Sequence, residues 1–155
     1  MLDALYGGRT FRTFNVIDES NREALRIEIG TSMTAARVVR VFEQLIELYG
    51  KPRALRTDNG PEFTSNLFQG WCEQQGIALL YIQPGKPDQN AFIERFNRSY
   101  RNEVLNLYVF DNIDQVQQLT DEWLNSYNHE RPHDSLGRVP PLTFMPRSQT
   151  ASLST

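Results

Sequence analysis

The sequence has little cysteine, no long apolar run and no excess of basic residues. Its 155 residues include one cysteine, Cys72, which excludes an internal disulfide framework and a zinc site built on paired cysteines. No apolar stretch approaches the about 20 residues that cross a bilayer. No charged segment followed by an apolar block opens the chain, so no signal peptide is visible. We therefore expect a cytoplasmic protein without a membrane segment.

The charge balance is slightly acidic. Lys and Arg number 16 against 19 Asp and Glu, which gives a formal net charge of −3. A protein that coats nucleic acid throughout carries a basic excess. Any nucleic-acid contact of this chain therefore has to come from a local group of arginines. The hydrophobic fraction of 39%, with 11% aromatic residues, is sufficient for the core of one domain.

The order of apolar patterns predicts a mixed α/β sheet flanked by helices. Strands are expected over 9–18, 24–29, 54–57 and 77–82, and helices over 34–49, 64–75, 89–107 and 113–127. The Gly7-Gly8 pair predicts a hairpin turn before the first of these strands. Helices are expected on both faces of the sheet. The predicted organisation is one domain over 1–146, followed by a disordered tail over 147–155.

Two of these elements carry specific predictions about burial. The helix 64–75 is expected to bury one stripe, formed by Leu67, Phe68, Trp71 and Cys72. The run 77–82 is almost entirely apolar. Such a run is typical of a strand that is covered on both faces.

Two acidic residues are placed where they can converge. Asp58 directly follows the strand 54–57, and Glu94 lies in the first turns of the helix 89–107, with 35 residues between the two acids. In an open α/β sheet, strand ends and helix starts at one edge form a crevice. Carboxylates are ligands of Mg²⁺, and two such ions can clamp the attacking and leaving oxygens of a phosphoryl transfer.

Two arginines share the helix face of the second acid. Arg98 and Arg101 follow Glu94 at i+4 and i+7. An acid at a metal with arginines one and two turns further on suits contact with a DNA backbone. Taken alone, the same helix also fits a simpler interpretation, an amphipathic helix with a solvated face of salt bridges.

Three blocks of sequence carry a resemblance to a known family. They are TDNGPEF (57–63), QPGKPDQNAFIERFNRSYRNEVL (83–105) and YNHERPHDSLG (127–137), the last followed by PPLTF. In this order they resemble the catalytic core of bacterial insertion-sequence transposases of the DDE class, which are related to retroviral integrases. The likeness covers residues 6–146. It implies an RNase H-like fold, a pair of Mg²⁺ (or Mn²⁺) ions held by three carboxylates, and attack on DNA phosphodiesters.

The resemblance also assigns residues and partners. Asp58 matches the second and Glu94 the third acid of the family, both catalytic and metal-binding. Arg98 and Arg101 match positions where integrases place basic residues that contact DNA. Four further residues fall in loops that the family uses near the site: Asn59, Lys86, Gln89 and Asn90. The implied partners are transposon ends, target DNA and further copies of the chain, in association with a bacterial nucleoid.

The family's first acid has no match in this sequence. It belongs on the first strand, in a Trp-x-x-Asp-Phe-like pattern ahead of the segment that here reads DALYGG (3–8). Asp3 falls too late to match it, and Asp18 is expected to cap a turn. We therefore expect a shortened first strand and little or no cleavage or strand transfer. The alternative interpretation is an inactive fragment that oligomerises with, or inhibits, a full-length transposase.

Overall fold

The structure, a computed structural model, describes residues 1–83, 85–86, 90–129 and 153–154. The strands are β1 (Leu2–Ala4), β2 (Thr10–Asp18), β3 (Ala24–Gly30), β4 (Ala54–Thr57), β5 (Ala78–Tyr81) and β6 (Leu153–Ser154). The helices are α1 (Ala35–Tyr49), α2 (Pro61–Thr64), α3 (Asn66–Gln75), α4 (Ala91–Tyr100), the π-helical turn η2 (Arg101–Leu105) and α5 (Ile113–His129). The expected mixed α/β architecture is confirmed.

The described strands form one sheet in the order β1-β2-β6-β4-β5, with β3 also paired to β2. Strands β1, β2 and β3 are antiparallel, whereas β4 is parallel to β5 and β6. Arg12 pairs with residues of both β1 and β3, and Ile17 with residues of both β6 and β3. Because each residue of a strand has one neighbour on each edge, β1 and β6 lie end to end along one edge of β2, opposite β3.

Strand β6 differs from the expected disorder over 147–155. Leu153 and Ser154 pair with Asp18 and Ile17 of β2 and with Leu55 and Arg56 of β4. They therefore join the antiparallel part of the sheet to the parallel part. The other residues of that segment lie outside the described ones. Local sequence does not predict this strand, because Leu153 and Ser154 pair only with strands that are far away in the sequence.

The predicted hairpin at Gly7-Gly8 joins β1 and β2. Gly8 adopts a φ of 89°, a value that glycine reaches without a steric penalty. The Leu5 N–H donates to the Arg9 carbonyl at 2.8 Å and closes the turn. Beyond β1, the Met1 ammonium donates to the Thr13 carbonyl, and the Thr13 N–H donates back to the Met1 carbonyl. The line of β1 thus continues to Met1.

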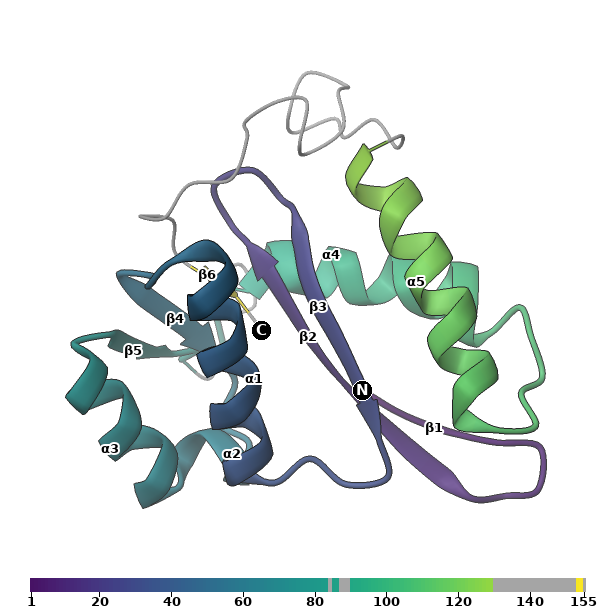
Figure 1. The fold of residues 1–155 in the computed structure, drawn as a ribbon, viewed down its shortest axis with the longest axis horizontal. Coiled ribbons are helices and arrows are strands. Elements are labelled where there is room, and N and C mark those ends of the chain that lie inside the picture. The colour runs from purple at the N-terminus through teal and green to yellow at the C-terminus, as the bar shows by residue number, and fades with distance from the viewer. Residues whose placement is uncertain (84, 87–89, 130–152, 155) are drawn as a thin grey trace.

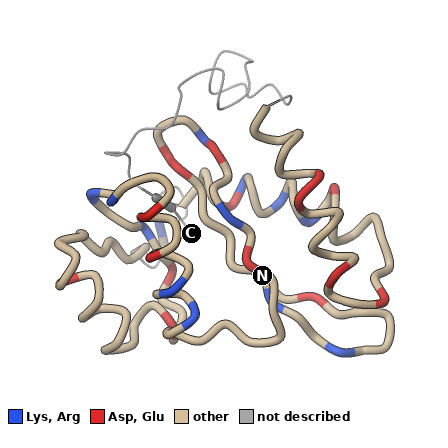
Figure 2. The backbone as a smooth tube through the Cα atoms, viewed as in Figure 1, with Lys and Arg blue, Asp and Glu red and all other residues tan. Residues whose placement is uncertain are grey.

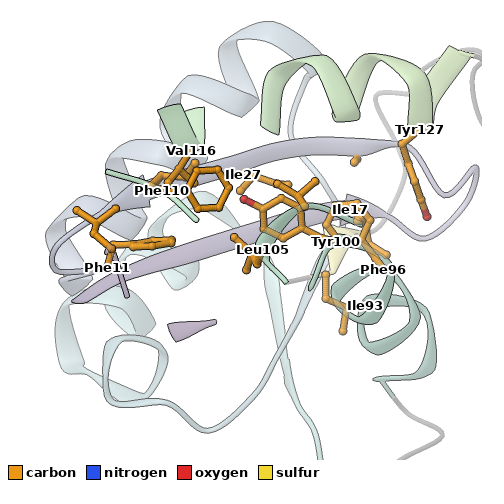
Figure 3. Close-up of a cluster of buried hydrophobic side chains, with 14 residues drawn as sticks. Phe11, Ile17, Ile27, Ile93, Phe96, Tyr100, Leu105, Phe110, Val116 and Tyr127 are labelled. Carbon is orange, nitrogen blue, oxygen red and sulfur yellow. The ribbon is translucent and has the colours of Figure 1, made fainter. Parts of the chain in front are cut away.

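The two faces of the sheet have separate apolar cores. Phe11 and Ile17 of β2 point to one face, where α4 and α5 pack, and Phe14 and Val16 point to the other, where α1 and α3 pack. This alternation is the period of two that a strand imposes. Figure 1 shows α1, α2 and α3 grouped around β4 and β5, with α4 and α5 beside β2 and β3. Figure 3 shows the core that contains Phe11 and Ile17, between the strands and helices α4 and α5.

Helix α4 is fixed by a fully apolar stripe. Ile93, Phe96 and Tyr100 are each 0% exposed in the core that they share with β2, β3 and α5. The Tyr100 hydroxyl is also hydrogen-bonded to the Thr120 hydroxyl of α5 at 2.7 Å. Burial is the largest influence on the Tyr100 phenol and raises its pKa to about 12. The predicted helix over 89–107 is confirmed in type, and η2 ends it at Leu105.

Two burial predictions were wrong in part. Phe68, Trp71 and Cys72 of the expected helix stripe are buried, as predicted. Ser65 interrupts the expected helix 64–75 and caps α3 by accepting the Phe68 N–H, and Leu67 in the first turn is 55% exposed. The apolar run 77–82 is not covered on both faces, because Ala78 and Leu80, which share one face of β5, are exposed, Leu80 by 42%. Strand β5 is also the terminal strand of the described sheet. A short apolar run alone does not reveal whether a strand is central or terminal.

Replacing Phe42 of α1 tests the core on the α1 and α3 side. Its ring is 1% exposed and lies 5.5 Å from that of Phe14, 5.9 Å from Phe68 and 6.0 Å from Trp71, centroid to centroid. We expect Phe42→Ala to lower the free energy of unfolding in urea by about 3–5 kcal/mol. The control, Leu48→Ala on the same helix, removes a side chain that is 66% exposed and should cost less than about 0.5 kcal/mol. Equal losses would contradict this core.

Candidate functional site

Asp58 is held at the end of β4 by the turn that follows it. Its Oδ1 accepts a hydrogen bond of 2.7 Å from the Gly60 N–H, while the side chain remains exposed. A Cβ placed on Gly60 would lie 2.9 Å from Asp58 Oδ1 and also 2.9 Å from Glu62 Oε1. The two carboxylate oxygens are therefore no more than twice that distance apart. A side chain at position 60 would require these carboxylates to shift.

Three polar residues follow one another along the same face of α4. Asn90, Asn97 and Arg101 are spaced from Glu94 by four, three and seven residues, so all four share one side of the helix and its continuation. Asn97 Oδ1 accepts a hydrogen bond of 2.7 Å from Asn15 Nδ2 of β2. One turn later, Arg101 contacts β1: its guanidinium donates to the Leu2 carbonyl at 2.9 Å and to Asp3 at 3.4 Å.

A polar cavity of about 140 Å³ lies between these elements. Its lining comes from β2 and the start of the chain (Met1, Arg12, Thr13, Phe14, Asn15), from Met33, from the turn after β4 (Asp58, Glu62, Phe63) and from α4 (Asn90, Asn97). Glu94 does not line it and is exposed, but it is placed between the lining residues Asn90 and Asn97 on their helix face. The cavity thus brings the Asp58 turn and the Glu94 helix face to the same edge of the sheet.

The chemistry of this lining suits a small hard cation. Asn15 Oδ1, Thr13 Oγ1 and Asn90 Oδ1 are buried and have no hydrogen-bond partner within the described residues. Together with the carboxylates of Asp58 and Glu62, they make a set of oxygen atoms, the ligand type that Mg²⁺ prefers. The fit is incomplete, because among the described residues no three Asp, Glu, His or Cys side chains converge closely enough to hold a metal.

Charged groups of both signs influence the cavity. The pKa of the Met1 ammonium is lowered mainly by burial and further by the charges of Arg12 and Arg101. Asp58 and Glu62 raise it and so oppose this effect. Figure 2 shows acidic and basic residues side by side along α4, whereas α5 carries acidic residues. Helix α4 and η2 carry Arg95, Arg98 and Arg101, whereas α5 carries neither Lys nor Arg.

The remaining sequence-predicted residues have varied positions. Asn59 Nδ2 donates to the Ile82 carbonyl at 3.1 Å and ties the turn after β4 to the end of β5. Lys86 and Arg98 are exposed, and Gln89 lies outside the described residues. The guanidinium of Arg101, expected to contact DNA, instead contacts the Asp3 carboxylate and the Leu2 carbonyl. Contact of these side chains with DNA stays a prediction.

Sequence reasoning missed four lining residues. The sequence patterns do not single out Arg12, Asn15, Glu62 or Asn97, yet all four line the cavity. One signal was available for Asn97, which is three residues after Glu94 and therefore on its helix face. For Asn15 the signal was a polar residue in the middle of the apolar strand β2.

The two other acids near the start of the chain have structural roles. Asp3 pairs with Arg101. Asp18 is 3% exposed at the end of β2, and its Oδ1 accepts from both the N–H and the hydroxyl of Ser20. This is the turn cap that the sequence predicts for Asp18. Burial is the main cause of a raised Asp18 pKa, and the hydrogen bonds from Ser20 counteract it.

Asp18→Asn tests this environment by its pH dependence. Because burial raises the pKa of Asp18 above its ordinary value of 3.8, the folded state favours the protonated form. The contribution of Asp18 to stability is therefore full at low pH and falls as the pH rises from 3.8 through the raised pKa. Asparagine keeps the acceptor for Ser20 and does not titrate. We expect the variant to gain stability relative to the wild type as the pH increases over this window, measured by urea unfolding. A relative loss would contradict the assignment.

The fold is RNase H-like. Two solved structures share this fold. The HTLV-2 integrase catalytic core in complex with magnesium has a TM-score of 0.63 and 20% sequence identity, and the match covers 90% of this chain and 88% of that chain. The catalytic core of BIV integrase has a TM-score of 0.67 and 20% identity, and the match covers 92% of this chain and 88% of that chain. At this level of identity the likeness concerns the fold alone.

The family follows from sequence comparison. Two family profiles, both described as integrase core domain, match residues 2–87 and 75–141, and the chain belongs to this family. It is 42% identical over 150 residues to an uncharacterized 39.2 kDa protein of insertion element IS476 from Xanthomonas euvesicatoria, covering 97% of this chain and 43% of the relative. It is 37% identical over 144 residues to a 31.7 kDa protein of IS407 from Burkholderia multivorans, covering 93% and 52%. The chain spans about half the length of these relatives and is an integrase catalytic core of the insertion-sequence type.

Proposed function

We propose that this chain is the core of a transposase that cuts and joins DNA phosphodiesters with divalent metal ions bound at Asp58 and Glu94. The observation that supports this most directly is the cavity beside the end of β4. It is lined by Asp58 and by Asn90 and Asn97, the two residues that flank Glu94 on its helix face. The insertion-element relatives and the magnesium in the HTLV-2 integrase core support the same reaction class.

The residues of this chain have distinct roles in that reaction. Asp58, oriented by the Gly60 N–H, and Glu94, carried by α4, would hold the ions. Bound Mg²⁺ or Mn²⁺ supplies charge stabilisation of the attacking and leaving oxygens. The exposed cations Arg98 and Lys86 would contact the phosphate backbone without reading its sequence. Arg101 would join them by exchanging its contact with Asp3 for a phosphate.

We propose that neither Asp3 nor Asp18 takes the place of the family's first acid, which is supported by the contact of Asp3 with Arg101 and of Asp18 with Ser20. Met1 pairs with Thr13, and the next β2 residues, Phe14 and Asn15, line the cavity. The line of β1, prolonged, therefore passes through the cavity, which is where a first-strand acid would complete the site. Asp58 and Glu94 are the two residues of this chain that match family acids, and we propose that these two alone would bind the ions weakly.

The second candidate function follows from the incomplete set of acids. It is an inactive core that assembles with, or inhibits, a full-length transposase. Oligomers are a reasonable expectation, since the HTLV-2 core has been solved in dimeric and trimeric forms. Both candidate functions place the protein at DNA in the bacterial cytoplasm. Within the described part of the chain, no helix has the length and apolarity that crossing a membrane requires.

Mn²⁺ titration followed by electron paramagnetic resonance tests the shared metal site. We expect Asp58→Asn and Glu94→Gln each to weaken Mn²⁺ binding by about 100-fold or more, since each removes a charged ligand. Glu47→Gln, an exposed acid of α1, is the matched control and should bind as the wild type does. Equal Mn²⁺ affinity in all four proteins would contradict the proposed function.

Nicking of supercoiled plasmid with Mg²⁺ or Mn²⁺ separates the two candidates. Nicking that Asp58→Asn abolishes and Glu47→Gln preserves would support an active core. No nicking, together with mixed oligomers of this chain and an intact transposase, would support the inactive assembly partner. Nicking that Asp58→Asn leaves unchanged would exclude this site as its source.

A further inference from the structure

Asn15 is a polar side chain in an apolar position. It is 5% exposed in the middle of β2, on the strand face that also carries Phe11 and Ile17 toward α4. Its Nδ2 donates to Asn97 Oδ1 at 2.7 Å and also lies 3.3 Å from Met1 Sδ. Its Oδ1 is buried without a partner among the described residues. An apolar residue would avoid this cost of burying an amide, so the role of Asn15 is not packing alone.

The partner of Asn15 occupies a decisive position on α4. Asn97 is three residues after Glu94, so any rotation of the helix that moves Asn97 also moves Glu94. The adjacent side of α4, about 100° around the helix axis, is held by Ile93, Phe96 and Tyr100, all fully buried. Close packing of these three side chains already limits the rotation of the helix. A polar contact on the side that carries Glu94 adds a constraint with a defined direction. The hydrogen bond is directional and supplies that constraint.

We propose that Asn15 is a positioning residue that, through Asn97, sets the rotation of α4 and thereby directs Glu94 toward the Asp58 edge of the cavity. The effect on metal binding rests on the proposed function. The effect on the orientation of α4 does not. Arg101, one turn after Asn97, makes a second contact between this segment and the sheet, with Leu2 and Asp3 of β1. Its side chain is long, flexible and partly exposed. The side chains of Asn15 and Asn97 are shorter, so their hydrogen bond restricts the movement of α4 more than the Arg101 contact does.

Asn128 provides a matched control for Asn15. It is also a buried asparagine, 9% exposed, and it also joins a helix, α5, to a strand, β3. Its Nδ2 donates to the Ala24 carbonyl at 2.9 Å, and its Oδ1 accepts from the Ala24 N–H at 2.8 Å. Asn128 does not line the cavity. Asn128→Ala should therefore lower stability without a specific effect on the acids.

Mn²⁺ affinity of Asn15→Ala and Asn128→Ala, each with and without Glu94→Gln, is the first test. We expect Asn15→Ala to weaken Mn²⁺ binding about 10-fold, the range for groups that orient a ligand. In the Glu94→Gln background it should add no further loss, because the effect acts through Glu94. Asn128→Ala should bind Mn²⁺ as the wild type does in both backgrounds. An Asn15→Ala loss that persists without Glu94 would overturn the proposal.

A distance measurement keeps the inference testable apart from metal binding. In a Cys72→Ala background, nitroxide labels at cysteines introduced at positions 58 and 94 report the distribution of distances between the two sites. We expect Asn15→Ala to broaden or shift this distribution and Asn128→Ala to leave it unchanged. If Asn15→Ala does not fold, Asn97→Ala removes the same hydrogen bond from the half-buried helix side.

The outcomes distinguish the two levels of the argument. Absence of Mn²⁺ binding in the wild type would contradict the proposed function, while a distance distribution that depends on Asn15 would still support the positioning role. An unchanged distribution in both Asn15→Ala and Asn97→Ala would refute the positioning role even if the wild type binds Mn²⁺.

Discussion

The attachment of α4 to β2 is the contact on which the site depends. Three fully buried side chains of the helix, Ile93, Phe96 and Tyr100, share a core with Phe11 and Ile17 of the strand. On the next side of the helix, the hydrogen bond from Asn15 to Asn97 faces the cavity. Apolar burial thus supplies the free energy that holds the helix to the sheet, and polar contacts of Asn97 with Asn15 and of Arg101 with Leu2 and Asp3 add directional constraints. Glu94 inherits its position from both.

The Asp58 side of the site is built on a different principle. Its position comes from a short parallel strand and from local turn chemistry, since the Gly60 N–H fixes the carboxylate within two residues of the strand end. Such a turn is determined by nearby sequence, and TDNGPEF therefore signals it directly. The Glu94 side is determined by packing between segments about 80 residues apart, such as Asn15 and Asn97, and cannot be read from either segment alone.

This difference explains what the sequence could and could not predict. The helices expected over 34–49 and 113–127, the hairpin at Gly7-Gly8 and the strand before Asp58 depend on local patterns, and the structure confirms them. The exposure of Leu80 depends on the place of β5 at the sheet edge, and strand β6 depends on pairing with β2 and β4. The lining residues Arg12, Asn15 and Glu62 were missed for the same reason. Whether a polar residue of an apolar strand faces a cavity is decided by the helix packed above it.

The central claim is that Asp58 and Glu94 hold a divalent cation together at one edge of the sheet. A crystal structure of the chain grown with Mn²⁺, with anomalous data collected near the manganese absorption edge, tests this most directly. The account predicts an anomalous peak within coordination distance of carboxylate oxygens of both residues, about 2.0–2.3 Å. Ordered carboxylates of Asp58 and Glu94 on separate surfaces, with no manganese bound between them at saturating concentration, would contradict it.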